Sequence, residues 1–369
     1  MDQLLFSYFF LALEILIIHS IPNVKIKRKY YFFFFFIQFA FLSGFRGLDI
    51  HNDTLSYASH FDNVSSKGHF WEIEKELFNP GYLVIEKFIH NNITNTVLGF
   101  NIITSTVICL CSLFLFYKRS RHIGIAIFLY YISGEFFGQI AVLRESFAVL
   151  VGYCCILLIS KKEYLKSIPL ILVAISFHNS SFILFLLLLL VWTSPSTKTK
   201  VIIFFSVVFV TYAIAPIIEL VLNLLAFETK YFTEGVDRGF ASANGFFNGT
   251  IGILTAMSVY MMIKNSKGNY IYPIWYDILY VYTIISVLSL RLPILSRYLM
   301  FFSPFIFIMV SNLIFVSKKN VRYGILVAFI LATNIIVKQQ FRPEWISIFP
   351  YHLYDDSQLG LLLDTYIKL

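Results

Sequence analysis

The chain has 369 residues, of which 58% are hydrophobic and 14% charged, and its formal net charge is +8. Apolar runs of about 20 residues, long enough to cross a bilayer as a helix, recur from end to end, and no polar block reaches the size of a soluble domain. The sequence therefore predicts an all-α polytopic integral membrane protein with a single membrane domain over residues 1–369. The basic residues gather in short clusters between apolar runs, which is typical of cytoplasmic loops and argues against nucleic acid as a partner.

The first two predicted helices enclose a basic cluster. The first, Leu4 to Ile21, has no basic segment before it and no cleavage site after it, so we expect it to stay in the membrane. The cluster Lys25–Lys29 follows and indicates the cytoplasmic side. The second helix, Tyr30 to Gly44, then brings the chain to Arg46 on the outer side.

Residues 46–95 include the longest polar passage of the chain, and we expect them to form a large outer loop between the second and third helices. The aromatic residues in this loop argue against disorder, because disordered segments are poor in aromatics. A long loop that is ordered is usually functional. Leu83 to His90 has apolar residues at helical spacing and is expected to lie along the membrane interface.

The middle of the chain is less regular. A third helix, Thr96 to Tyr117, returns to a basic cluster at 118–121, and two apolar runs on either side of Ser133–Glu145 are expected to meet at the outer face. The run Ser167 to Trp192 is interrupted at His178–Ser181, which leaves halves of about ten residues that are too short to span untilted. Two short helices, or one long helix with an inserted polar site, are both consistent with this pattern; we favour the pair.

The last third of the chain adds five apolar runs, a second outer loop at 228–249 and an outer C-terminal tail at 338–369. The runs are Val201–Phe227, Thr250–Ile263, Ile274–Leu290, Tyr298–Val316 and Tyr323–Val337. The whole chain thus has about twelve transmembrane or partly spanning helices with both termini outside. Seventeen of the 29 Lys and Arg residues then fall in inner segments together with a single acidic residue, Glu163, so the charge bias sets the orientation.

Arginine is distributed unlike lysine. Six of the ten Arg residues fall on the predicted outer side, where topology needs no positive charge: Arg46, Arg144, Arg238, Arg291, Arg297 and Arg342. A guanidinium binds phosphate or carboxylate through two parallel hydrogen bonds and keeps its charge, so outer arginines indicate an anionic substrate. Arg144 and Arg297 are flanked by apolar helix and are expected to point into the bundle. A structural ion pair, for instance of Arg144 with Glu145 or Glu135, is the alternative.

Carboxylates, a histidine and aromatic residues accompany these arginines. Asp49 and Asp53 follow Arg46 closely, and a carboxylate beside a cation stays ionised, as a general base requires. The same two carboxylates could hold a divalent metal, but no third ligand is evident, so we expect neither a metal nor another cofactor. His178, in an apolar run, is either a hydrogen-bonded structural residue or a catalytic one. Two roles are open for the aromatic residues Tyr57, Trp71 and Tyr82. They could anchor the chain at the membrane interface, or they could stack against a sugar ring.

An outer face with arginines, carboxylates and aromatics suits one class of reaction. A lipid diphosphate is a leaving group that needs cationic stabilisation, and a sugar hydroxyl is a nucleophile that needs a base. We therefore predict a membrane glycosyltransferase. The catalytic candidates are Arg46, Asp53, Arg144, His178 and Arg297, and the substrate-binding candidates are Asp49, Tyr57, Tyr82, Glu145, Arg238 and Arg291.

Most of these residues lie in motifs through which the chain resembles the EpsG family of bacterial exopolysaccharide and O-antigen polymerases, the Wzy-like proteins. The motifs follow the family's order along nearly the whole chain: Phe45-Arg46-Gly47, Asp53-Thr54-Leu55-Ser56-Tyr57, Asn79-Pro80-Gly81-Tyr82, Arg144-Glu145-Ser146-Phe147-Ala148, Phe177-His178-Asn179-Ser180, Ser296-Arg297-Tyr298 and Pro350-Tyr351. The chain departs from the family at His51-Asn52 in place of Gly-Thr, at Asn79 in place of Glu, and at Glu145 in place of Gln. The last change favours local neutralisation of Arg144.

The resemblance implies a polymerase that transfers a growing glycan from undecaprenyl diphosphate to a hydroxyl of the next lipid-linked repeat unit. It implies the bacterial inner membrane, with the active site facing the periplasm. The implied partners are the lipid-linked donor and acceptor, membrane lipids and a chain-length regulator protein. Two alternatives stay open. A flippase for lipid-linked oligosaccharides would need charged residues along a midplane cavity, and an O-antigen ligase-type glycosyltransferase would differ only in its acceptor.

Overall fold

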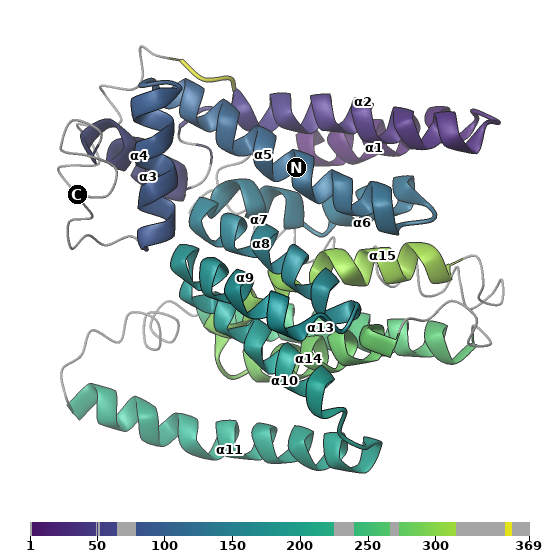
Figure 1. Cartoon of the computed structure of the whole chain (residues 1–369), viewed down its shortest axis with the longest axis vertical. Coiled ribbons are helices and arrows are strands. Elements are labelled where there is room, and N and C mark those ends of the chain that lie inside the picture. The colour runs from purple at the N-terminus through teal and green to yellow at the C-terminus, as the bar shows by residue number, and fades with distance from the viewer. Residues whose placement is uncertain are drawn as a thin grey trace. The chain divides into compact units, whose positions relative to one another are not determined.

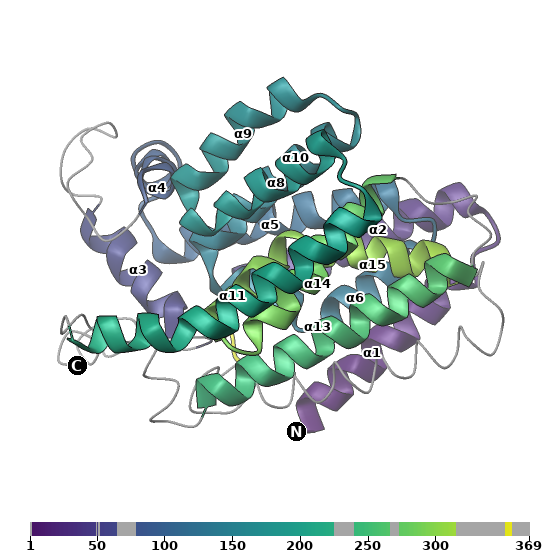
Figure 2. The ribbon, with the colours of Figure 1, turned by 90° about the horizontal axis from the view of Figure 1, so that it is seen from below.

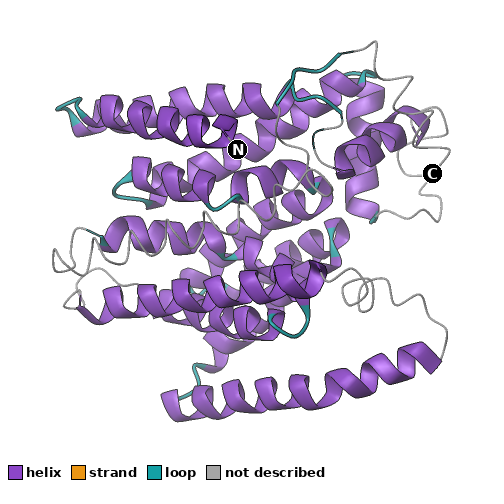
Figure 3. Cartoon of the chain, turned by 180° about the vertical axis from the view of Figure 1, so that it is seen from behind, coloured by secondary structure: helices purple, strands orange, loops and turns teal. Residues whose placement is uncertain are grey.

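The computed structural model describes residues 2–48, 50, 52–64, 79–224, 240–265, 273–314 and 351–355. Within these ranges the chain is almost entirely helical and contains no β-strand (Figure 1 and Figure 3). The predicted all-α class is therefore confirmed. In chain order the elements are α1 (Asp2–His19), α2 (Val24–Gly44), α3 (Asn52–Val64), α4 (Pro80–Asn92), α5 (Val97–Arg119), α6 (Ile123–Ile132), α7 (Glu135–Ala141), α8 (Leu143–Ser160), α9 (Tyr164–Phe177), the 3₁₀-helix η1 (Asn179–Phe182), α10 (Ile183–Thr193), α11 (Thr197–Leu224), α13 (Phe240–Asn265), α14 (Pro273–Ser289), the 3₁₀-helix η2 (Pro293–Phe301) and α15 (Ser303–Leu313).

The chain divides into two compact units. The first unit comprises Met1–Cys154, Ile168–Ser181 and Gln340–Leu369, and the second comprises Cys155–Ser167 and Phe182–Gln339. In the first unit α2 and α5 pack along each other (Figure 1). In the second unit α13 and α14 lie side by side (Figure 1 and Figure 2), and η2 and α15 pack against them.

Local sequence decides where several helices begin. The side chains of Asn23 and Thr96 each accept hydrogen bonds from backbone N–H groups in the first turn that follows, of α2 and α5 respectively. These N–H groups have no partner inside the helix, so such caps stabilise the helix start. Pro80 opens α4, at a position where its missing N–H costs nothing. Gly134, with a φ of 78°, provides the left-handed backbone at which the chain bends by 64° between α6 and α7.

Length and composition mark several helices as membrane-spanning. Val97–Arg119 and Leu143–Ser160 are each long and apolar enough to cross a membrane. Two bent pairs raise the number to four if each pair is one span: Ile123–Ile132 with Glu135–Ala141, and Leu295–Phe301 with Ser303–Leu313. Shorter apolar helices accompany them. These features belong to a membrane protein, while the total of about twelve spans and the periplasmic side of the large loop stay predictions.

The predicted large outer loop contains two helices in its described part. α4 covers the Leu83–His90 segment, whose helical spacing is confirmed. α3 was not predicted, because only one narrow face of this polar segment is apolar. That face carries Thr54, Tyr57, Ala58 and Phe61, all of them buried. Their spacing of three and four residues is that of a helix that buries one stripe. Residues 65–78 lie outside the described ranges.

Of two other predictions about where helices end, one is confirmed and one is wrong. The break at His178–Ser181 separates two short helices, α9 and α10, so the favoured pair is confirmed. The run Tyr298–Val316 is not one helix, because η2 ends at Phe301 and α15 starts after a bend of 54°. Pro304 stands in the first turn of α15, where a proline starts a helix but cannot continue one.

Residues 240–249 of the predicted second outer loop, 228–249, are helical and belong to α13. The predicted loop itself stays a prediction. Residues 225–239 lie outside the described ranges, as do 315–350 and 356–369, which hold the last predicted span and most of the predicted C-terminal tail.

The basic cluster before the second predicted helix is part of α2 and contacts the end of α5. Arg28 donates hydrogen bonds to the backbone carbonyls of Tyr117 and Ser120, and its guanidinium lies 5.3 Å from the centre of the Tyr117 ring. The last carbonyls of a helix attract cations. The two clusters that the sequence assigns to the cytoplasmic side therefore lie together in the first unit.

Candidate active site

Arg46 joins three helices of the first unit. Its side chain is completely buried. The guanidinium donates hydrogen bonds to the backbone carbonyl of Ser43 in α2, to Oγ of Ser105 in α5 at 3.1 Å and to the carbonyl of Ile140 in α7 at 3.0 Å. Burial lowers the pKa of Arg46 to about 10, so it is still charged at neutral pH. These contacts describe a cation that holds helices in place.

The C-terminal segment pairs with the backbone around Arg46. Arg46 and Leu353 form an isolated antiparallel bridge. The N–H of Gly47 donates to the carbonyl of His352 at 3.0 Å, and the N–H of Tyr354 donates to the carbonyl of Phe45 at 2.9 Å. The first motif of the sequence is therefore in contact with the residues that directly follow the last motif.

Next to this junction, α3 and α4 face each other through paired side chains. Asp53, Tyr57 and His60 follow one another on α3 at spacings of four and three residues, and Tyr82 and Glu86 are four apart on α4. Residues at these spacings share one face of a helix. The rings of Tyr57 and Tyr82 have centroids 5.5 Å apart, and Nδ1 of His60 lies 2.7 Å from Oε2 of Glu86.

Arg144, at the start of α8, reaches the same group. Its Nε donates a long hydrogen bond of 3.5 Å to the Tyr57 hydroxyl, and its side chain is half-buried. Burial raises the pKa of the Tyr57 phenol, opposed by Arg144, while the negative charge of Asp53 adds to the increase. Burial also raises the pKa of Tyr82 far above its ordinary value, again opposed by Arg144. Arg144 therefore interacts electrostatically with the phenols of Tyr57 and Tyr82, and Asp53 interacts with that of Tyr57.

His178 lies in the turn between α9 and η1. Its Nδ1 accepts a hydrogen bond from the backbone N–H of Ser180 at 3.2 Å and lies 2.6 Å from Oγ of Ser180. Because Nδ1 is the acceptor, the neutral ring carries its hydrogen on Nε2. The ring is half-buried.

Three contacts join the neighbourhood of His178 to the helices that carry the tyrosines and Arg144. Asn79, which precedes α4, donates to the side-chain oxygen of Asn179 at 3.2 Å. Gly81 approaches Ser176 of α9 so closely that an added Cβ would lie 2.9 Å from backbone atoms of Ser176. The rings of Phe147 in α8 and Phe177 in α9 stack with centroids 5.8 Å apart. α4, α8 and α9 thus meet at this group of residues.

The other candidates are placed differently. Glu145 follows Arg144 but is 98% buried, so it faces the protein interior. Its carboxylate in the first turn of α8 suits the positive end of the helix dipole. Arg291 and Arg297 belong to the second unit, where Arg291 is half-buried and Arg297 is exposed on η2. The candidates that lie outside the described residues are Asp49, Arg238, Arg342 and Trp71.

The structure therefore gathers Asp53, Tyr57, Tyr82 and Arg144 at one place in the first unit. It also adds His60 and Glu86, which the sequence reading did not single out. The signal that could have found them is their spacing, since His60 follows Tyr57 by three residues and Glu86 follows Tyr82 by four.

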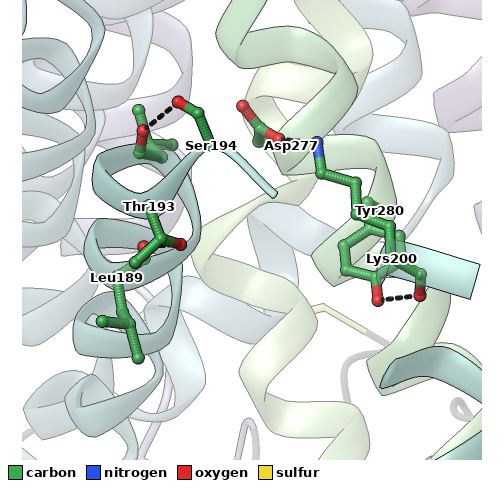
Figure 4. A network of polar contacts seen from close by, with 7 residues as sticks. Leu189, Thr193, Ser194, Lys200, Asp277 and Tyr280 are labelled. Atoms are coloured by element: carbon green, nitrogen blue, oxygen red, sulfur yellow. Dashed lines mark hydrogen bonds and ion pairs between the residues drawn. The ribbon is translucent and has the colours of Figure 1, made fainter. Parts of the chain in front are cut away.

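The second unit has a polar group of its own (Figure 4). Nζ of Lys200 in α11 lies 2.6 Å from Oδ1 of Asp277 in α14, and the Tyr280 hydroxyl donates to the carbonyl of Lys200 at 2.6 Å. Figure 4 shows these residues near Thr193 and Ser194 at the end of α10. The contacts tie α11 to α14 and neutralise Asp277, which lies within the predicted apolar run Ile274–Leu290.

Helices that span a membrane, with arginine, carboxylate and tyrosine side chains gathered beside them, define a polytopic membrane protein with a polar site. The family model described as "EpsG family" matches residues 29–353, which is most of the chain. The chain belongs to the EpsG family, and the resemblance seen in its motifs is confirmed. The family suggests a membrane protein of the polysaccharide-polymerase kind. No curated protein and no solved structure is significantly similar to the chain.

Proposed function

We propose that the protein is a polysaccharide polymerase of the bacterial inner membrane that works at the periplasmic face. It transfers a growing glycan from undecaprenyl diphosphate to a hydroxyl of the next lipid-linked repeat unit. The product is an O-antigen or exopolysaccharide chain. Family membership supports the class of protein, and the grouping of Arg144 with Tyr57, Tyr82 and Asp53 supports the reaction.

The grouping of Arg144 with two tyrosines is the observation that carries the proposal. Arg144 donates through Nε to Tyr57, and a guanidinium is the side-chain group that binds two oxygens of a diphosphate at once. The charge that develops on the diphosphate as the glycosidic bond breaks is stabilised by a cation fixed in advance. The rings of Tyr57 and Tyr82 are buried against each other and hold α3 and α4 together beside Arg144.

The remaining candidates take supporting roles in this proposal. Asp53 either takes the proton of the acceptor hydroxyl or orients Arg144 through Tyr57. Arg297, on the second unit, is proposed to contact a phosphate group of a lipid-linked substrate. His178 is proposed to lie against a sugar of the substrate. Arg46 acts as a positioning residue, because it binds Ile140 in the segment that leads to α8 and hence to Arg144.

Deleting the coding sequence in its host tests the function. We expect the deletion strain to carry single repeat units on the final glycan acceptor and no long chains, and a plasmid copy to restore the chains. Loss of all repeat units outside the membrane would instead indicate a flippase. Long chains that accumulate on the lipid carrier without reaching the final acceptor would indicate a ligase.

Topology reporters test the proposed orientation. A reporter that is active only in the cytoplasm should be active after Lys162 or Lys319 and inactive when inserted between Ser65 and Gly68. This follows from the charge bias of the inner segments. The opposite pattern would put the Tyr57–Arg144 group on the cytoplasmic side and overturn the proposed active face.

A further inference from the structure

The helical backbone is interrupted between α7 and α8. Val142 has a φ of −106° and a ψ of 74°, which lie outside the helical region, and the N–H of Ser146 donates to its carbonyl at 2.9 Å to begin α8. The carbonyls in the last turn of α7 have no partner within a helix, so they need one elsewhere. The carbonyl of Ile140 accepts from Arg46 at 3.0 Å. The carbonyl of Gln139 accepts from Oγ of Ser146.

Gln139 also joins α7 to three other helices through its side chain, which is completely buried. Its Oε1 accepts hydrogen bonds from Oγ of Ser112 in α5 at 3.0 Å and from the hydroxyl of Tyr130 in α6 at 2.7 Å. Its Nε2 donates to the hydroxyl of Tyr153 in α8 at 2.6 Å. A buried polar network whose hydrogen bonds are made fixes the relative positions of the helices that carry it.

Ser146 and Tyr153 attach α8 to this one residue of α7 at two points. They are seven residues apart, so they share one face of α8, about 10 Å apart along its axis. Two points of attachment restrict the rotation of a helix about its own axis. Arg144 lies two residues before Ser146, which is about 200° around the helix. Because Ser146 faces α7, the Arg144 side chain is directed to the other side of α8, where it meets Tyr57 of α3.

We propose that Gln139 and Ser146 are positioning residues of the transfer reaction, which place Arg144 by fixing the rotation of α8; this rests on the proposed function. Both act through Arg144 and need no contact with the substrate. A displacement of about 1 Å near a reacting centre can cost about 100-fold in rate. The hydroxyl of Ser146 is the link closest in the chain to Arg144, so its removal is the sharpest test.

Ser146→Ala removes the bond to the Gln139 carbonyl and leaves a small side chain in place. In purified full-length protein, with carrier-linked repeat units extracted from the deletion strain, we expect kcat to fall about 10–100-fold while KM changes less. Ser146→Thr keeps a hydroxyl at this position and should recover most of the rate.

Ser167→Ala is the matched control. Ser167 is also buried, and its hydroxyl donates to a backbone carbonyl, that of Tyr164 in α9, at 2.7 Å. This variant loses the same kind of hydrogen bond at a position that is not attached to Arg144. It should lose about as much thermal stability as Ser146→Ala and polymerise at the wild-type rate.

A double variant shows whether Ser146 acts through Arg144. Arg144→Lys lowers the rate by itself. If Ser146 only positions this cation, Ser146→Ala should lower the rate of Arg144→Lys by less than about twofold, because the two changes remove the same contribution. Losses that multiply would mean that the two residues act independently.

Tyr153→Phe decides the case in which Ser146→Ala does not fold. It removes the other attachment of α8 to Gln139 and leaves the Ser146 bond in place. We expect a several-fold lower kcat, and again little further loss when Arg144→Lys is present.

Two results would overturn the proposal: a wild-type kcat in folded Ser146→Ala, or independent losses in the double variants. A failure of the proposed function looks different, because the wild-type protein itself would then not elongate the same lipid-linked units.

Discussion

The phenol of Tyr351 donates a hydrogen bond to the backbone carbonyl of Leu42, 309 residues earlier in the chain. The segment around Tyr351 also pairs with the backbone of Phe45 and Gly47. Because Arg46 lies between these two residues, the C-terminal segment holds the turn from which the Arg46 side chain enters the protein interior. The end of the chain thus supports the junction of α2, α5 and α7.

Tyr351→Phe removes this hydrogen bond and keeps the ring. We expect the free energy of unfolding in detergent to fall by about 1 kcal/mol, the usual contribution of one such bond. Burial raises the pKa of Tyr351 to about 12, so the phenol remains a donor and the loss should be the same from pH 6 to pH 9. Tyr30→Phe, at an exposed position of α2, is the control and should leave stability unchanged. Equal stability of the two variants would contradict the structural role.

Arg46→Lys tests whether the buried guanidinium holds the helices together. A single ammonium cannot reach the carbonyls of Ser43 and Ile140 and Oγ of Ser105 together, so we expect a loss of about 1.5–3 kcal/mol in stability. Arg119→Lys, at the exposed end of α5, should have no effect. If Arg46→Lys unfolds like the wild type but no longer polymerises, Arg46 contacts the substrate and is not a positioning residue.

Gly81→Ala probes the close packing of α4 on α9. The new Cβ would lie 2.9 Å from the backbone carbon and oxygen of Ser176, closer than such contacts occur, so α4 must move. We expect lower thermal stability. We also expect a lower polymerisation rate, because a shift of α4 would move Tyr82, the next residue, away from Tyr57. The double variant with Ser176→Ala should not recover, since the clash involves the backbone as well as the side chain. Full recovery would mean that only the Ser176 hydroxyl limits the packing.

Arg144→Lys and Arg297→Lys each test an arginine proposed to bind phosphate groups of the lipid-linked substrates. A lysine keeps the positive charge but loses the planar fork, so binding should survive better than transition-state stabilisation. We expect each variant to lower kcat by up to a few hundredfold, about 3 kcal/mol, and to raise KM less. Chain elongation by purified protein is the measurement. Wild-type rates in both variants would make these arginines structural and place the diphosphate site elsewhere.

Asp53→Asn keeps the shape of the side chain and removes its charge. If Asp53 holds Arg144 through Tyr57, we expect a reduced rate that Tyr57→Phe reproduces, and a strain that carries mainly short glycans. A much larger loss in Asp53→Asn than in Tyr57→Phe would instead make Asp53 the proton acceptor. Normal chain lengths in a well-folded Asp53→Asn would remove it from the mechanism.

The sequence by itself predicted the membrane class, the helical fold and the family. Long apolar runs must satisfy their backbone hydrogen bonds within a helix once they are in lipid, so composition alone is enough for that conclusion. The sequence also predicted the break at His178, because a polar interruption leaves apolar halves that are too short to span a membrane. Residues such as Arg46, Tyr57 and Arg144 could be identified as candidate site residues, because their motifs follow the order of the EpsG family.

Which of these residues touch one another was decided only by the tertiary structure. Arg46 and Arg144 are both outer arginines in the sequence, yet Arg46 is fully buried on protein acceptors while Arg144 is half-buried beside Tyr57. The sequence could not distinguish them, because burial depends on helices that arrive from distant parts of the chain. The His60–Glu86 link depends in the same way on α3 and α4 packing face to face, with the facing sides set by the helical repeat of each segment and the pairing set by the fold.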